Sequence, residues 1–210
     1  MSTKKWIFLI VIFLIVIVFP SFNYDVNDED VAVAKDKEIK QENISIVFGK
    51  VDNNEDFVKF ISFCIDKIPE SHNLETYIPL DLVIAQAIHE SAWGNSRFAK
   101  EGNNLFGIRT WDNKRKQLKP LEVPNAVWGI IVFDKQCDSI EYYYKLINNH
   151  NAYINFRESR RIMIENSQKL DGLVLATFLS MFSELGHEYT DRLKETIIEL
   201  RKDYPWLQQY

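Results

Sequence analysis

Apolar residues recur three or four positions apart along most of the chain beyond residue 43, so that in each segment they share one face of a helix. This spacing predicts amphipathic helices over residues 53–68, 79–93, 138–147, 155–165, 173–182 and 189–202. The body of the chain is therefore expected to be mostly helical, with the apolar faces packed together.

Residues that favour helix ends stand at several of these boundaries. Asn53 or Asn54 is suited to cap the first helix and Pro69 to stop it. Gly94 is expected to close the second helix, and Pro205 to end the last one. Asp138 or Ser139 is expected to cap the third helix.

The region from residue 107 to residue 133 departs from the helical period. Residues 107–111, 121–123 and 127–133 contain β-branched and aromatic side chains, and a basic polar stretch separates the first two segments. They predict a small antiparallel lobe of two or three strands inserted between helices. The fold class is therefore α+β, a predominantly α-helical domain with a small β-lobe flanking a cleft, the kind of place where extended polymers bind.

The N-terminus has a different character. Lys4 and Lys5 precede an unbroken apolar run over residues 6–19, as in an export signal. This run is shorter than the roughly 20 residues of a comfortable membrane span, yet the small-x-small cleavage site of a processed signal is poorly formed in residues 20–25. We interpret residues 1–24 as a signal peptide or signal anchor, residues 25–43 as an acidic linker and residues 44–210 as the folded domain. The protein is expected in the periplasm, soluble after cleavage or anchored in the inner membrane through residues 6–19.

Composition excludes several classes of protein. The 210 residues include 25 Lys and Arg against 30 Asp and Glu, and this acidic balance disfavours nucleic-acid binding. The two cysteines, Cys64 and Cys137, fit no multi-cysteine zinc pattern, and their pairing is left open. Because no phosphate-binding loop, dinucleotide fingerprint or metal cluster is present, we expect no cofactor and no metal site.

The densest chemical signal lies at the end of the second predicted helix. Glu90 falls on or beside an otherwise apolar face, in the last turn, where the helix dipole disfavours a negative charge. Trp93, three residues on, is suited to exclude water from it. Both effects raise the pKa of a carboxyl group, as a general acid requires. The alternative is an ordinary ion pair with Arg97 or Lys100. A zinc HExxH motif is absent, because Trp93 stands where the second histidine is needed.

Residues 85–108, AQAIHESAWGNSRFAKEGNNLFGI, resemble the signature of the glucosaminidase family of peptidoglycan hydrolases, glycoside hydrolase family 73, and in particular its Bax-like branch. Further segments that resemble this branch are residues 132–134, 138–140, 148–153, 156–160 and 182–186, with Tyr189 shortly after. The resemblance extends over roughly residues 46–202.

This resemblance implies a lysozyme-like fold and hydrolysis of the β-1,4 bond after N-acetylglucosamine in peptidoglycan glycan strands. It matches Glu90 to the general acid of the family, and Asn104, Phe106 and Tyr189 to residues of its cleft. Trp93 is a further candidate for substrate binding. Trp111 and Trp128 are candidates to stack on sugar rings, although aromatic residues in such a domain are more often core residues.

A second carboxylate usually acts opposite the acid in glycoside hydrolysis. Glu122, on the predicted β-lobe, is the first candidate, and Asp112 and Glu184 compete with it. An acetamido group of the substrate, assisting from within, would remove the need for a second protein nucleophile.

Two other functions stay open. A lytic transglycosylase uses the same fold but leaves anhydro-muramyl ends, and a membrane-tethered module that binds peptidoglycan with little activity would keep the domain without the chemistry. The sequence indicates no protein partner.

Overall fold

The computed structural model describes residues 53–209. They lie within one unit of the chain, residues 39–210. The predicted signal or anchor and the acidic linker, residues 1–43, fall outside the described residues, as do the first residues of the predicted domain. Within residues 53–209, no helix is both long and apolar enough to cross a membrane.

The first described helix, α3 (Asn54–Asp66), follows the predicted pattern. The Asn53 side chain caps it by accepting a hydrogen bond of 2.9 Å from the Asp56 backbone N–H. Its apolar face, which includes Phe57, Ile61 and Cys64, is fully buried. A 3₁₀ helix, η2 (Pro69–His72), begins at the proline that was expected to stop α3.

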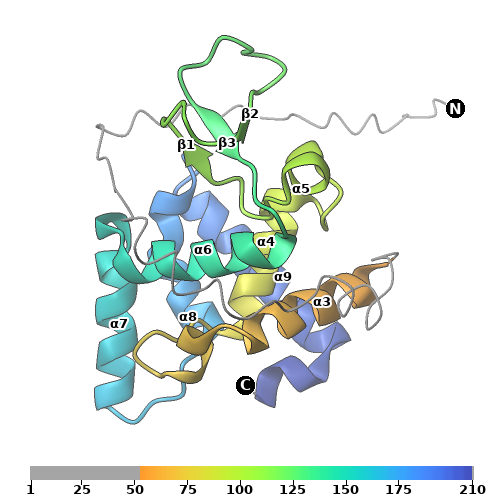
Figure 1. Cartoon of the computed structure of the whole chain (residues 1–210). Helices are drawn as coiled ribbons and strands as arrows, with labels where there is room; N and C mark the ends of the chain where they lie inside the picture. Colours follow the sequence, from red (N-terminus) through yellow and green to blue (C-terminus); the bar gives the residue numbers. More distant parts are fainter. Residues whose placement is uncertain (1–52, 210) are drawn as a thin grey trace, which may run out of the picture. The chain divides into compact units, whose positions relative to one another are not determined.

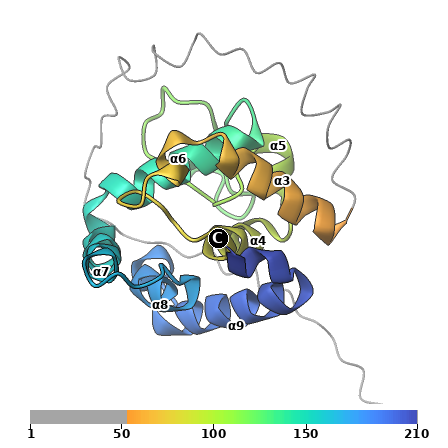
Figure 2. The ribbon, with the colours of Figure 1, turned by 90° about the horizontal axis from the view of Figure 1, so that it is seen from below.

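The central helix is α4 (Leu80–Ser91), which is buried along nearly its whole length because apolar residues lie on all its sides. Figure 2 shows it between α9 (His187–Asp203) and the pair formed by α3 and α6 (Gln136–Asn149). Its last turn, which carries Glu90, is therefore held from two sides.

The end of α4 differs from the prediction. The helix stops at Ser91 and not at Trp93, since Ala92, Trp93 and Gly94 all have left-handed backbone angles, with φ of 51°, 59° and 74°. The Ser91 hydroxyl accepts a hydrogen bond of 2.8 Å from the Gly94 N–H. A Cβ at Gly94 would lie 3.1 Å from the Phe57 ring, so α3 packs closely against this turn.

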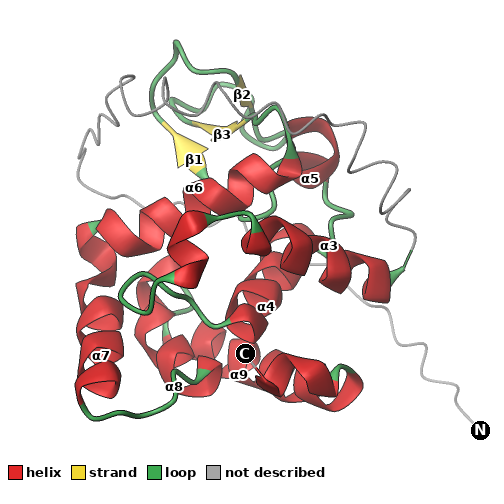
Figure 3. Ribbon diagram, turned by 60° about the horizontal axis from the view of Figure 1, so that its bottom comes forward, coloured by secondary structure: helices red, strands yellow, loops and turns green. Residues whose placement is uncertain are grey.

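The described residues contain one three-stranded antiparallel sheet, drawn at the top of Figures 1 and 3. It consists of β1 (Arg109–Thr110), β2 (Gln117–Leu118) and β3 (Gly129–Ile131) in the order β1-β3-β2. A short helix that the sequence did not predict, α5 (Arg97–Gly102), precedes it. Residues 121–123, expected in a strand, lie in the loop between β2 and β3, because β3 pairs with Gln117 and Leu118 instead.

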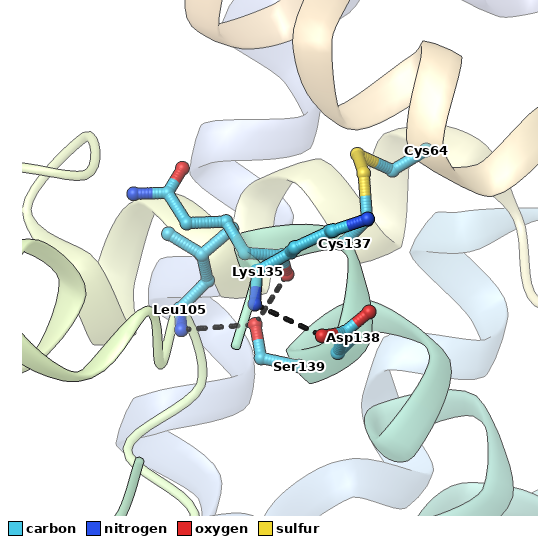
Figure 4. Close-up of a disulfide and its surroundings, with 7 residues drawn as sticks. Cys64, Leu105, Lys135, Cys137, Asp138 and Ser139 are labelled. Atoms are coloured by element: carbon cyan, nitrogen blue, oxygen red, sulfur yellow. Dashed lines mark hydrogen bonds between the residues drawn. A yellow bond between two sulfur atoms is a disulfide. The ribbon is translucent and has the colours of Figure 1, made fainter. Parts of the chain in front are cut away.

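Helix α6 begins earlier than predicted. Its N-cap is Lys135, whose backbone N–H donates a 2.9 Å hydrogen bond to the Asp138 carboxylate. Just inside this end, Cys137 forms a disulfide with Cys64 of α3, as Figure 4 shows. The predicted inner face of α6, which includes Ile140, Tyr143 and Tyr144, is fully buried.

The predicted helix over residues 173–182 is split in two. Helix α8 (Gly172–Ala176) leads into the 3₁₀ helix η4 (Thr177–Phe182), with non-helical backbone angles at Leu179. The break lets Phe182 stack on Tyr189 of α9, with ring centroids 6.1 Å apart and planes at 7°. The remaining elements are η3 (Asn151–Tyr153), α7 (Ile154–Glu165) and η5 (Pro205–Gln209).

The fold class is confirmed: an α+β domain, mostly helical, with a small antiparallel sheet, consistent with a lysozyme-like domain.

Candidate active site

Glu90 lies in the last turn of α4 and is half-buried. The Tyr189 hydroxyl, from α9, donates a 2.9 Å hydrogen bond to Glu90 Oε1. Burial raises the pKa of the Glu90 carboxyl from 4.5 to about 7, although the Tyr189 hydrogen bond and the positive charge of Arg109 act in the opposite direction. Near neutral pH this carboxyl can both donate and accept a proton.

Within the described residues, Glu90 forms no ion pair with Arg97 or Lys100, the alternative that the sequence offered. Arg97 instead binds the Glu101 carboxylate at 3.0 Å and the Lys119 carbonyl oxygen at 3.0 Å. The pKa of Glu90 is therefore set by burial, by the Tyr189 hydrogen bond and by the charge of Arg109.

Behind Tyr189 lies a chain of buried hydrogen bonds. Gln86, one turn before Glu90 on α4, donates through Nε2 to the Tyr189 hydroxyl at 3.1 Å. Tyr143 of α6 donates its hydroxyl proton to Gln86 Oε1. Gln86 and Tyr143 are fully buried, so the chain is shielded from water.

Arg109, the first residue of β1, is the part of the small sheet that interacts with Glu90. Its guanidinium stacks on the Trp128 ring at 4.2 Å from the centroid, and its charge interacts with both Glu90 and Glu184. Burial lowers the pKa of Arg109 and the two carboxylates oppose that shift. Arg109 is thus a cation shared by two acidic residues.

The turn before β1 passes beside the Glu90 carboxyl. Gly107 has a φ of 61°, and a Cβ there would lie 3.6 Å from Glu90 Oε2. Asn104 shapes this turn: Nδ2 donates to the carbonyls of Ile108 and Ile131, and Oδ1 accepts from the N–H groups of Phe106 and Ile108. The Ser139 hydroxyl accepts a further bond from the Leu105 N–H, shown in Figure 4.

Most other residues that the sequence suggested for the substrate are core residues. Asn104 is fully buried and its amide is occupied by backbone groups, so its predicted contact with sugar gains no support from the geometry. Phe106 is 2% exposed and stacks on Tyr143 with ring centroids 4.2 Å apart. Trp93 contacts Phe57 edge-on at 5.8 Å, because the left-handed turn removes it from the helical face it was expected to share with Glu90. Trp128 lies under Arg109, and Trp111 is 49% exposed.

The candidates for the second carboxylate are all exposed. Glu122 and Asp112 lie in the loops beside β2, and Glu184 lies between η4 and α9. Of the three, Glu184 is coupled through Arg109 to Glu90.

Sequence reasoning missed Gln86, Tyr143 and Arg109 as parts of the site. The available signal was Gln86, a polar residue inside an otherwise apolar stripe, which needs a buried partner.

Among residues 53–209 no group of three or more His, Cys, Asp or Glu side chains is placed to hold a metal ion. His89, beside Glu90, binds the Thr196 hydroxyl at 2.8 Å.

Comparison with known proteins assigns the family. Residues 69–200 match the glucosaminidase family, described as mannosyl-glycoprotein endo-beta-N-acetylglucosaminidase. The chain belongs to this family, and both Glu90 and Tyr189 lie within the matched residues. Over 129 residues, 60% of this chain, it is 31% identical to Protein bax of Escherichia coli (strain K12). The match covers 45% of that relative, so the chain spans less than half of its length. No solved structure matches the chain significantly.

Proposed function

We propose that this chain is a peptidoglycan hydrolase that cleaves the β-1,4 bond after N-acetylglucosamine in glycan strands, with Glu90 as general acid. The observation that carries the proposal is the half-buried Glu90 carboxyl, whose pKa of about 7 lets it hold a proton near neutral pH. Membership of the glucosaminidase family supplies the substrate class.

In the proposed reaction, Glu90 gives its proton to the glycosidic oxygen while the bond between C1 and that oxygen breaks. Water then adds its oxygen to C1 and its proton is taken up by a carboxylate. The Tyr189 hydroxyl stabilises Glu90 after the proton has left, because it donates to Oε1. Arg109 also stabilises the carboxylate through its positive charge. Four residues are proposed to form the substrate-binding part of the site: Tyr189, Trp93, Phe106 and Asn104. The last two act from within the core, where they support the turn beside Glu90.

The second carboxylate is proposed to be Glu122 or Glu184. Glu122 was favoured from the sequence, and Glu184 is favoured by its coupling to Arg109. Glu122→Ala and Glu184→Ala should be assayed side by side, because only the variant that removes the second group will lose turnover while folding normally. Asp112→Ala is assayed beside them as the third candidate. If all three variants keep full turnover, the acetamido group of the substrate takes this role.

We also propose that the protein is exported, with peptidoglycan as its partner and residues 1–24 as the signal or anchor. The Cys64–Cys137 disulfide supports an oxidising compartment.

The test is digestion of purified peptidoglycan by the full-length protein, followed by borohydride reduction and mass spectrometry of the new sugar ends. Reduced N-acetylglucosamine ends are expected. Glu90→Gln should lose about 100-fold to 10,000-fold in rate, whereas Glu195→Gln, an exposed change on α9, should not. Anhydro-muramyl ends would assign a lytic transglycosylase instead. Binding to the wall without new ends would assign a binding module.

A further inference from the structure

The three hydrogen bonds behind Glu90 run in one direction. Tyr143 donates to Gln86, Gln86 donates to Tyr189, and Tyr189 donates to Glu90. The four side chains come from three helices, α6, α4 and α9.

This direction follows from how many protons each group has. A tyrosine hydroxyl has one proton to donate, whereas the Gln86 amide has a donor end and an acceptor end. Because Tyr143 donates to Oε1, the Nε2 end of the amide is directed at the Tyr189 oxygen. Tyr189 therefore accepts from Gln86 and donates its single proton to Glu90 Oε1. If Oε1 of Gln86 faced Tyr189 instead, the Tyr189 hydroxyl would donate its proton to Gln86, and Glu90 would lose this hydrogen bond.

The same reasoning distinguishes the two oxygens of Glu90. Oε1 accepts from Tyr189, so in the protonated carboxyl the proton belongs on Oε2, the oxygen beside Gly107. At Gly107 no side chain stands in front of that oxygen. We propose that Gln86 and Tyr143 are positioning residues, which fix Tyr189 as a donor to Glu90 Oε1 and thereby assign the acid proton to Oε2.

Packing of the core does not by itself require a polar group at Gln86. Gln86 stands in a fully buried stretch of α4, where an apolar side chain would fill the space without an amide to satisfy. The groups that lower the pKa of Glu90 are Tyr189 from α9 and Arg109 from β1. Tyr143 from α6 and Tyr153 from η3 also interact with Glu90, whose negative charge raises the pKa of both hydroxyls. Of these four groups, Tyr189 is hydrogen-bonded both to Gln86 and to Glu90, so Gln86 acts on Glu90 through Tyr189.

The inference rests on the proposed function for its meaning, but its test does not need catalysis. The pKa of Glu90 is measured in the full-length protein by ¹³C NMR titration of labelled Glu carboxyl carbons, with Glu90→Gln identifying the signal. Gln86→Met keeps the side-chain length and removes both ends of the amide. The Tyr189 hydroxyl is then a weaker and less directed donor, so the pKa of Glu90 is expected to rise by about one pH unit.

Tyr143→Phe should raise the pKa of Glu90 in the same direction by less, since it frees the amide without deleting it. The matched control is Tyr144→Phe, which removes an equally buried hydroxyl from the same helix, one that donates to the Ile78 carbonyl at 3.2 Å. This control should leave the Glu90 titration where it was.

The decisive measurement is a double variant. In a Tyr189→Phe background, Gln86→Met should cause no additional shift, because Gln86 acts only through the hydroxyl that is already missing. An unchanged Glu90 pKa in folded Gln86→Met, or the full shift persisting without the Tyr189 hydroxyl, would overturn the inference. In active enzyme, the basic limb of the kcat profile should move up with the same variants while KM stays constant. Absence of hydrolysis would refute the proposed function and leave the NMR result intact.

Discussion

Glu90→Gln is expected to make the protein more stable at neutral pH while it lowers the rate of hydrolysis by orders of magnitude. The wild-type fold holds Glu90 where burial disfavours its ionised form, so ionisation opposes folding. Glutamine keeps the shape of the side chain and can still accept the Tyr189 hydrogen bond, but it carries no charge.

The magnitude follows from linkage between protonation and folding. The folded carboxyl holds its proton up to about pH 7, and the reference value for the free group is 4.5. Between these values the folded chain binds more protons than the unfolded chain, so the free energy of unfolding falls as pH rises through this window. One pKa unit corresponds to about 1.4 kcal/mol, so above pH 7 the free energy of unfolding is lowered by about 3 kcal/mol. Glu90→Gln should recover most of it.

The assay is denaturant or thermal unfolding of the purified protein at several pH values from 4 to 8 (roughly one-unit steps suffice). At pH 8 the variant should melt roughly 10 °C above the wild type, and at pH 4 the two should coincide. Glu195→Gln, on the exposed side of α9, is the matched control for removal of one negative charge.

A difference between Glu90→Gln and wild type that does not vary with pH would refute the reasoning, because only titration of Glu90 produces the expected window. Destabilisation by Glu90→Gln at pH 8 would refute it as well, since it would mean that the ionised carboxylate is favoured by its surroundings.

Other predictions concern the pH profile and the parts of the fold that hold the site. Peptidoglycan hydrolysis should decline above about pH 7, as Glu90 loses its proton, which a rate profile from pH 5 to 9 will check. Reduction of the Cys64–Cys137 disulfide, which joins residues 73 apart, should cost about 4 kcal/mol, and a Cys64→Ala/Cys137→Ala double variant unaffected by reductant provides the control. Arg201→Ala should cost about 3 kcal/mol in urea unfolding because it leaves the buried Asp81 carboxylate without its partner. Asn104→Leu should cost about 3 kcal/mol and lower activity, since the backbone groups that shape the turn at Gly107 lose their partners; unchanged stability would contradict this structural role.

The sequence alone determined the features that depend on neighbouring residues. The buried face of α3 and the inner face of α6 were predicted from a period of three or four residues, because the packed side of a helix is set by the positions of its apolar side chains. The family was likewise indicated by one contiguous motif around Glu90. Elements whose form depends on packing were missed: the left-handed turn at Trp93 packs against Phe57 on α3, and the break at Leu179 lets Phe182 reach Tyr189.

Only the tertiary structure decided what surrounds Glu90. Tyr189 is 99 residues from Glu90 in the chain and 103 from Gln86, and Tyr143 is 57 from Gln86. Spacing along a sequence cannot show which side chains meet over such distances, because that depends on how α4, α6 and α9 pack. For the same reason Asn104, a motif residue with a polar side chain, was expected to face the substrate, whereas the fold buries its amide against backbone groups. The sequence placed a carboxylate at the end of a helix. The burial that raises its pKa and the hydrogen bond from Tyr189 that opposes this rise come from segments brought together by folding.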